Sequence, residues 1–316
     1  MEDFPRTLGE LESRFGSEQA CRDYLRQLRW PEGFRCPRCS HDRSWPVAKR
    51  LECAKCGYQA SLTAGTIFQD SHKPLSMWFR AIWWVTSQKN GTSALGLQRV
   101  LGLGSYQTAW TWLHKLRRAM VRPGRDRLTG RVEVDEMYWG SREEGWQGRE
   151  PGHKSLIAIA AQEDGRKIGR IRMARIPDAS AESLLGFIER SIEPGSIVHT
   201  DGWAGYTGLR KKGYEHESTP QGSLGRPGAE EDLLPRVHRV VSLLRRWLMG
   251  THQGAISPEH LDYYLDEFTF RFNRRTSTYR GKLFLRLLQQ AVAVEPAPYE
   301  QIAKGIRGRP RREHDL

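Results

Sequence analysis

Four cysteines near the N-terminus limit the fold of that region more than any other feature of the chain. They form two CxxC pairs, Cys36 with Cys39 and Cys53 with Cys56, separated by thirteen residues. Two thiolates at this spacing hold one side of a tetrahedral zinc ion, and the second pair completes the site without leaving a position for substrate. The sequence therefore predicts a structural zinc ribbon rather than a redox-active pair. The fifth cysteine, Cys21, follows a helical pattern and is expected in the core.

Length and charge define the class of protein. The 316 residues suffice for two or three domains, and the formal charge of +13 favours a polyanionic partner, because counterion release rewards clustered Lys and Arg on phosphates. No apolar run is long enough to cross a membrane, and residues 1–6 lack the features of a signal peptide. These features predict a cytoplasmic, nucleoid-associated protein that binds nucleic acid, with no membrane contact and no small-molecule substrate. Closely paired cysteines also argue against a secreted disulfide framework.

Two predicted helices joined by a glycine turn follow the ribbon. An apolar helix is expected at residues 75–87, and residues 93–101 and 105–118 read as helices on either side of Gly102-Leu103-Gly104. Ser105 can cap the second helix, so the pattern is typical of a helix-turn-helix, although an ordinary helical hairpin fits it as well. The side chains expected to contact DNA are polar or basic: Gln107, Thr108, Thr111, Lys115, Arg117 and Arg118.

From residue 131 the pattern changes from helices to strands. Strands are expected at 132–139, 156–161, 168–176, 196–200 and 214–218, with a helix at 181–192 and another at 258–272 that packs on the sheet. Three strands, a helix, a strand and further helix is the order of a ribonuclease-H-like α/β core, a mixed sheet with flanking helices. The expected domains are 1–70 for the N-terminal helix and zinc ribbon, 71–128 for the helix-turn-helix, 129–295 for the ribonuclease-H-like domain, and 296–316 for a basic, disordered tail.

Two aspartates lie at the ends of predicted strands. Asp135 is in the first strand, and Asp201 follows the fourth, 66 residues later. Neighbouring strands would bring these carboxylates together, and paired carboxylates suit hard divalent cations such as Mg²⁺ or Mn²⁺. Two such cations can activate a nucleophile and stabilise the leaving oxygen in a displacement at phosphorus. The competing interpretation is that both aspartates only cap turns at the ends of strands.

A third metal ligand is expected, and there are two kinds of candidate. Acidic residues 230–232 lie in a glycine-containing loop, whereas His238 opens a predicted helix 37 residues after Asp201. Arg245 lies two helical turns along the same face, where it can hold a phosphate near His238. This pairing favours His238, with Arg246 as a further DNA contact. For His238 alone, a phosphate-binding or structural role is the alternative.

Together these motifs resemble the zinc-ribbon insertion-sequence transposases, a bacterial and archaeal family with a ribonuclease-H-like catalytic domain whose third metal ligand is Glu, Asn or His. The resemblance covers nearly the whole chain through residues 63–68, 134–138, 200–206, 250–254 and 261–275. By position, Asp135 and Asp201 match the two aspartates of the family. His238 stands where most relatives carry Glu or Asn, and Arg245 stands where many carry Lys.

The resemblance implies a DNA transposase that binds terminal inverted repeats and target DNA. Strand cleavage and strand transfer would depend on Mg²⁺ or Mn²⁺, and joining two DNA ends implies a homo-oligomer on DNA. Two alternatives remain at this point. The chain could be a catalytically inactive DNA-binding protein, against which Asp135 and Asp201 argue. It could also be a structure-selective nuclease, against which the helix-turn-helix argues.

Overall fold

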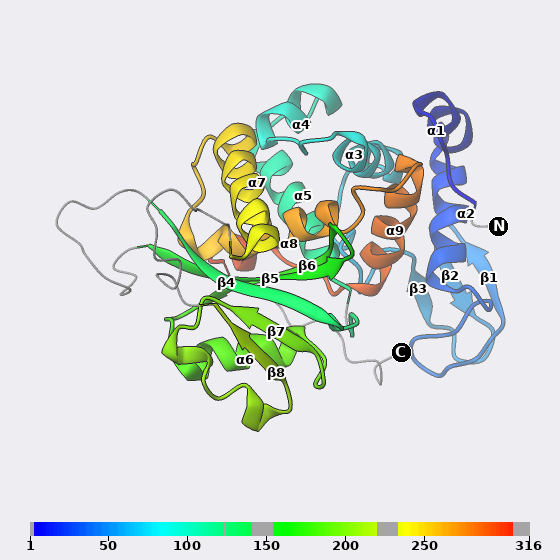
Figure 1. The fold of residues 1–316 in the computed structure, drawn as a ribbon. Helices are drawn as coiled ribbons and strands as arrows, with labels where there is room; N and C mark the ends of the chain where they lie inside the picture. The colour runs from blue at the N-terminus through cyan, green and yellow to red at the C-terminus, as the bar shows by residue number, and fades with distance from the viewer. Residues whose placement is uncertain (1–2, 123, 141–153, 220–232, 306–316) are drawn as a thin grey trace. The chain divides into compact units, whose positions relative to one another are not determined.

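The computed structural model describes residues 3–122, 124–140, 154–219 and 233–305 (Figure 1). The chain divides into two compact units. The N-terminal unit comprises residues 1–124 together with 276–316, and the central unit comprises residues 125–275. Within the described ranges, no helix has the length and apolar character needed to cross a membrane.

A small antiparallel sheet carries the paired cysteines of the N-terminal unit. Its strands, in the order β1-β2-β3, are β1 (Ser44–Val47), β2 (Arg50–Cys53) and β3 (Gln59–Ser61). Phe34, Leu51 and Ala60 form a small buried core around the cysteine side chains. A core with so few apolar side chains contributes little stability. This fits a fold that depends on a bound metal.

Two short helices precede this sheet, α1 (Leu8–Phe15) and α2 (Glu18–Arg29). Each begins at a hydroxyl side chain that accepts a backbone N–H of the first turn, Thr7 for α1 and Ser17 for α2. Cys21 lies fully buried in α2, and its thiol donates to the Phe15 carbonyl. Burial raises the pKa of Cys21 to about 12, so the thiol stays protonated and unreactive. The expectation that Cys21 is a core residue is confirmed.

The expected helix pair is present, with the expected turn chemistry. The helices are α3 (Leu75–Ser87), α4 (Ala94–Leu101) and α5 (Tyr106–Ala119). Helix α4 ends at Gly102, whose φ of 63° is the left-handed conformation that glycine adopts without strain. Ser105 caps α5 by accepting the Thr108 N–H at 3.1 Å. The turn and cap are therefore those of a tight helical hairpin.

The last helices of the chain belong to the N-terminal unit, which differs from the expected domain boundaries. Helix α9 (Arg280–Ala293) packs against α2, α3 and α5 rather than joining the domain expected at 129–295. Its Phe284 lies in an aromatic cluster with Phe15, Phe79 and Trp83. Helix α10 (Tyr299–Ala303) buries Ile302, so residues 296–305 form structure where a disordered tail was expected. Residues 306–316 lie outside the described ranges.

The central unit is built on a mixed five-stranded sheet in the order β6-β5-β4-β7-β8. Strands β4, β5 and β6 pair antiparallel, and β7 and β8 continue parallel to β4. The strands are β4 (Arg131–Trp139), β5 (Ser155–Asp164), β6 (Lys167–Ile176), β7 (Ile197–Thr200) and β8 (Glu215–Ser218). This is the ribonuclease-H-like arrangement expected from the order of the elements along the chain.

Helices cover both faces of this sheet (Figure 1). Alternate residues of β5 point to opposite sides: Ile157 and Ile159 pack with α7 and α8, while Ala158 and Ala160 pack with α6. Because both faces are buried there, residues 156–161 of β5 are all apolar. The helices are α6 (Ala181–Ser191), α7 (Pro235–His252) and α8 (Leu261–Phe272), with short 3₁₀ turns η1 (Ala204–Tyr206), η2 (Arg210–Lys212) and η3 (Pro258–His260). The expected packing of the helix at 258–272 on the sheet is confirmed.

Candidate metal sites and comparison with known proteins

The register of two parallel strands brings Asp135 and Asp201 to the same edge of the sheet. Strands β4 and β7 pair Val132 with Val198 and Glu133 with His199. Continued for two residues beyond the last of these pairs, the register would place Asp135 opposite Asp201, which directly follows β7. Adjacent strands lie about 4.8 Å apart, and residues in register share one face of the sheet. Two carboxylates that are distant in sequence are therefore neighbours in the fold.

Tyr206 lies fully buried close to both aspartates. Its hydroxyl donates to Glu136 Oε2 at 2.7 Å. Burial raises the pKa of Tyr206 well above its ordinary value, and the carboxylates of Glu136, Asp135 and Asp201 raise it further. Tyr206 therefore stays a neutral donor. Three acidic side chains around one tyrosine make this end of the sheet strongly negative, and a divalent cation would offset that charge.

A tight turn fixes the backbone at Asp201. The Asp201 carboxylate accepts the N–H of Trp203 at 3.0 Å, and Gly202, at a φ of 81°, donates its N–H to Thr200 Oγ1. The indole of Trp203 donates to the carbonyl of Ala179, which ties the turn to the segment before α6. The Asp201 side chain thus projects from a rigid strand end rather than from a free loop.

Helix α7 brings His238 to the Asp135 carboxylate. Odd-numbered residues of β4 face this helix, because Met137 packs in one core with Val237 and Val240. Nε2 of His238 lies 3.3 Å from Oδ2 of Asp135. The His238 side chain is 41% exposed and that of Asp135 is 20% exposed. The pair is therefore open to a ligand from solvent.

Glu133 holds the first turn of α7, a role that the sequence did not indicate. Its carboxylate is 2% exposed and accepts the backbone N–H groups of Arg236 and Val237 at 2.7 and 2.9 Å. The Arg236 guanidinium also donates to Glu133 at 2.9 Å. A negative charge at a helix N-terminus is favourable, and these bonds satisfy N–H groups that the helix leaves open. The sequence shows only a glutamate between Val132 and Val134 in a predicted strand, which does not reveal its partner on α7.

These side chains fit a hard divalent cation in an open site. Carboxylate oxygens and one imidazole nitrogen are ligands that Mg²⁺ and Mn²⁺ accept. Asp135, Asp201 and His238 do not form a closed three-ligand cluster; within the described ranges, only the cysteines do. One Asp201 oxygen accepts the Trp203 N–H. An open arrangement leaves room for substrate oxygens.

The four cysteines fit a closed tetrahedral zinc site. Their Sγ atoms all lie within 4.8 Å of one another. The separations are 3.7 Å for Cys36 and Cys56, 3.6 Å for Cys39 and Cys53, and 3.4 Å for Cys39 and Cys56. Tetrahedral coordination with Zn–S bonds of about 2.3 Å requires sulfur separations of about 3.8 Å. The predicted zinc ribbon is therefore supported by the geometry of its ligands.

The structure corrects two of the expected DNA contacts on α5. Arg117 is 2% exposed and Arg118 is 8% exposed, so neither guanidinium is presented to a phosphate. Both lie on the side of α5 that packs within the helical unit, as Leu116 and Ala119 do. The remaining predicted contacts on α5 line one cavity: Gln107, Thr108, Thr111 and Lys115.

The other predicted residues lie on α7 or outside the described ranges. Arg245 and Arg246 are exposed on α7, two helical turns beyond His238. The acidic alternative at residues 230–232 falls outside the described ranges. Of the predicted ligands, the structure therefore brings His238 to Asp135 directly and Asp201 beside it by strand register.

Comparisons with known proteins agree with these features. Residues 127–273 match the model of the ISXO2-like transposase domain, and residues 16–59 match that of the transposase zinc-ribbon domain. An uncharacterized protein in transposable element ISH50 of Halobacterium salinarum is 28% identical over 275 residues. The match covers 81% of this chain and 91% of the Halobacterium protein.

A solved structure was also matched, a simian T-cell lymphotropic virus intasome in complex with the PP2A regulatory subunit B56 gamma. The match has a TM-score of 0.32 and 14% identity, and it covers 59% of this chain and 70% of that chain. This likeness is too weak to carry an argument. The two domain matches instead cover the ribbon and the sheet whose geometry is described above. The chain therefore carries a transposase zinc-ribbon domain and an ISXO2-like transposase domain, the second on a ribonuclease-H-like sheet.

Proposed function

We propose that the protein binds the terminal inverted repeats of its element and catalyses divalent-metal-dependent DNA cleavage followed by strand transfer into target DNA. Joining two ends requires two active sites near each other, so the working form is a homo-oligomer on DNA. The protein would act in the cytoplasm, on nucleoid DNA. The basic charge of the chain supports this choice of partner, because phosphate neutralisation releases counterions.

The observation that carries the proposal is the imidazole of His238 3.3 Å from the Asp135 carboxylate, on a strand whose parallel neighbour β7 ends one residue before Asp201. Asp135 and His238 would hold the cation, and Asp201 would be the third ligand. When bound, Mg²⁺ or Mn²⁺ supplies Lewis acidity at the phosphoryl group and lowers the pKa of a nucleophilic water. Asp135 is fixed in β4, and Glu133 fixes the helix that carries His238.

Exposed arginines on α7 would hold the DNA backbone near this site. Arg245 lies two turns along from His238 and would bind a phosphate adjoining the scissile one. Arg246 would contact the next part of the backbone. On α5, Gln107, Thr108, Thr111 and Lys115 are the proposed contacts with the terminal repeat. Arg117 and Arg118 are not proposed as DNA contacts, because both side chains are buried.

A cleavage assay on the element's own end tests the proposal. The duplex would carry the terminal sequence joined to flanking DNA, with Mn²⁺ added or omitted. We expect Mn²⁺-dependent nicking at the end of the element, followed by joining of that end to a second duplex. Binding without any nicking would identify an inactive DNA-binding protein instead. Nicking of branched DNA without joining would identify a structure-selective nuclease.

A further inference from the structure

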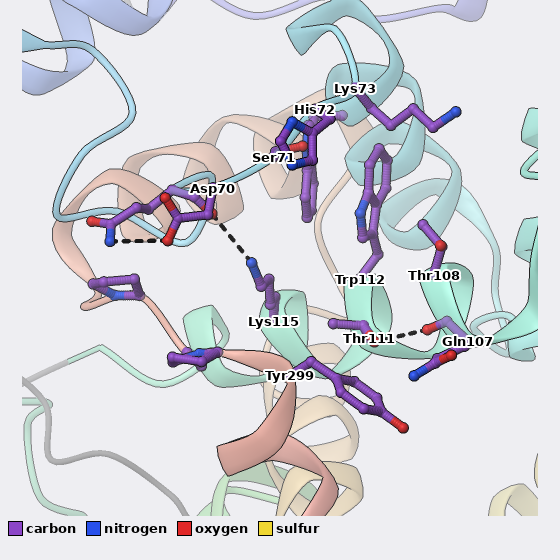
Figure 2. Close-up of a pocket in the computed structure, with 15 residues that line it drawn as sticks. Asp70, Ser71, His72, Lys73, Gln107, Thr108, Thr111, Trp112, Lys115 and Tyr299 are labelled. Carbon is purple, nitrogen blue, oxygen red and sulfur yellow. Dashed lines mark hydrogen bonds between the residues drawn. The ribbon is translucent and has the colours of Figure 1, made fainter.

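A cavity of about 580 Å³ lies within the N-terminal unit, beside the polar side of α5 (Figure 2). Four segments line it: residues 69–73, helix α3 through Trp78, helix α5, and residues 296–299 before and within α10. The α5 side chains in its wall are the four predicted DNA contacts and Trp112. This side of α5 is therefore not a flat surface but one wall of a half-open cavity.

Lys115 gives the cavity a cationic floor. Its ammonium donates to the Gln69 carbonyl at 3.4 Å, a long contact that leaves donor capacity for a ligand. Burial lowers the pKa of Lys115, and the nearby Asp70 carboxylate opposes that effect. The exposed side chains of His72 and Lys73 also line the cavity. An anionic group in the cavity could therefore contact the desolvated ammonium of Lys115 and the exposed ammonium of Lys73.

Aromatic rings give the same cavity a surface for a planar ligand. Trp112 is stacked on Trp78 with ring centroids 3.7 Å apart, which makes that wall rigid. Tyr299 lines the cavity near Thr111 and Gln107, and its side chain is 44% exposed. The Thr111 hydroxyl donates to the Gln107 carbonyl at 2.7 Å, so its lone pairs remain available as acceptors.

We propose that this cavity receives one unpaired nucleotide of the bound DNA, with its base against Tyr299 and its phosphate at Lys115. The inference rests on the proposed function, because it requires DNA along α5. The volume lies in the range of sites for single small ligands of about 300–1,000 Å³, and a duplex does not fit such a site. Cation and aromatic ring together are the combination that binds unstacked nucleotides.

Fluorescence anisotropy with two labelled probes tests the proposal. One probe is a blunt duplex, and the other is the same duplex with a short single-stranded thymidine extension. No Mg²⁺ or Mn²⁺ is added, so cleavage plays no part in the result. We expect the wild type to bind the extended duplex about tenfold more tightly than the blunt one. Tyr299→Ala should remove this preference and leave the affinity for the blunt duplex unchanged. Lys115→Met should also remove the preference, and it should weaken binding of the blunt duplex as well, because Lys115 is a proposed contact with the terminal repeat.

Matched controls separate the cavity from general surface effects. Tyr279, like Tyr299, is 44% exposed in the N-terminal unit and is not part of the cavity, so Tyr279→Ala should keep the preference. Lys304→Met is the corresponding control for Lys115→Met. The proposal is overturned if the wild type binds both probes equally. It is also overturned if the cavity variants keep the preference, since another surface would then bind the extension.

A second measurement reports on the base itself. 2-Aminopurine in the extension should lose fluorescence on binding to the wild type, because its base stacks on Tyr299, and should keep it with Tyr299→Ala. Equal quenching by both proteins contradicts the proposed base position. Loss of DNA cleavage in Asp135 variants tests the proposed function separately, because those variants should still quench the probe.

Discussion

At position 238 an imidazole lies 3.3 Å from the Asp135 carboxylate, on a helix that also carries two exposed arginines. If this imidazole is a metal ligand, His238→Ala should reduce Mn²⁺-dependent cleavage to near background without weakening DNA binding. His238→Glu should keep part of the activity, because a carboxylate also binds Mn²⁺. Cleavage rates on the element end would measure both effects. Ser242→Ala, an exposed position one turn further along α7, should cleave like the wild type.

The competing ligand is testable with the same assay. Normal cleavage by His238→Ala together with loss of cleavage in Glu231→Ala would assign the third ligand to the acidic segment at 230–232. A structural role for His238 predicts instead that His238→Ala loses stability. Thermal unfolding of that variant, with and without Mn²⁺, distinguishes loss of a ligand from loss of packing. The ligand role predicts that Mn²⁺ stabilises the wild type and not the variant.

The N-terminus of α7 depends on a carboxylate from a different element. Replacing Glu133 by Ala would leave two backbone N–H groups and the Arg236 guanidinium without their buried acceptor. We expect the free energy of unfolding to fall by about 2 kcal/mol. The Mn²⁺ concentration for half-maximal cleavage should rise, because His238 follows directly after the capped turn. Denaturant unfolding and a Mn²⁺ titration measure the two effects.

A partial rescue separates capping from simple core disruption. Glu133→Gln keeps one acceptor oxygen and should lie between the wild type and Glu133→Ala in both measurements. Glu215→Ala, at an exposed strand position, is the control and should change neither. If Glu133→Ala leaves the Mn²⁺ requirement unchanged while lowering stability, Glu133 does not position His238.

The zinc ribbon should depend on its metal for folding. Its apolar core is small, so removal of zinc should unfold β1–β3 and abolish recognition of the element end. The central unit has its own two apolar cores and should keep its structure and Mn²⁺-dependent nicking of nonspecific DNA. Zinc content, two-dimensional NMR spectra and nicking activity, each compared between the wild type and Cys53→Ser, would check this. A ribbon that stays folded in Cys53→Ser would contradict it.

Across the whole molecule, a formal charge of +13 predicts DNA binding that weakens steeply with salt. If Arg246 contacts a phosphate, Arg246→Ala should lower the slope of log K against log salt concentration by about 1. The affinity should fall by a similar factor for all sequences. Lys167→Ala, at the exposed first residue of β6, is the comparison. An unchanged slope in Arg246→Ala would remove this arginine from the DNA contact.

Local patterns predicted most of the central unit. The alternation of apolar residues at the start of β4, the continuous apolar run in β5 and the order of strands and helices indicated the sheet. Parallel pairing of β4 and β7 then brings the strand of Asp135 beside the strand that ends just before Asp201. The CxxC spacing likewise predicted the ribbon, because the four zinc ligands come in two pairs that are close in sequence. These features are encoded within a few residues of each other, where periodicity and spacing are informative.

Features that depend on distant contacts were not predictable. Helix α9 packs against α3, far upstream, and its amphipathic pattern does not say which element it covers. The basic run at Arg117 and Arg118 looked like a DNA contact, yet both guanidinium groups are buried among helices. The bond from Glu133 to the start of α7 joins residues more than a hundred positions apart. Each of these needs the tertiary fold, which a single sequence specifies only indirectly.

The central claim is that Asp135 and Asp201 hold a divalent cation that cuts DNA. The most direct measurement is Mn²⁺-dependent cleavage of the element end by the wild type, Asp135→Asn, Asp201→Asn and the exposed control Asp164→Asn. We predict that both site variants lose cleavage and keep end binding, while Asp164→Asn behaves like the wild type. Excision by the Asp135→Asn, Asp201→Asn double variant would contradict the claim.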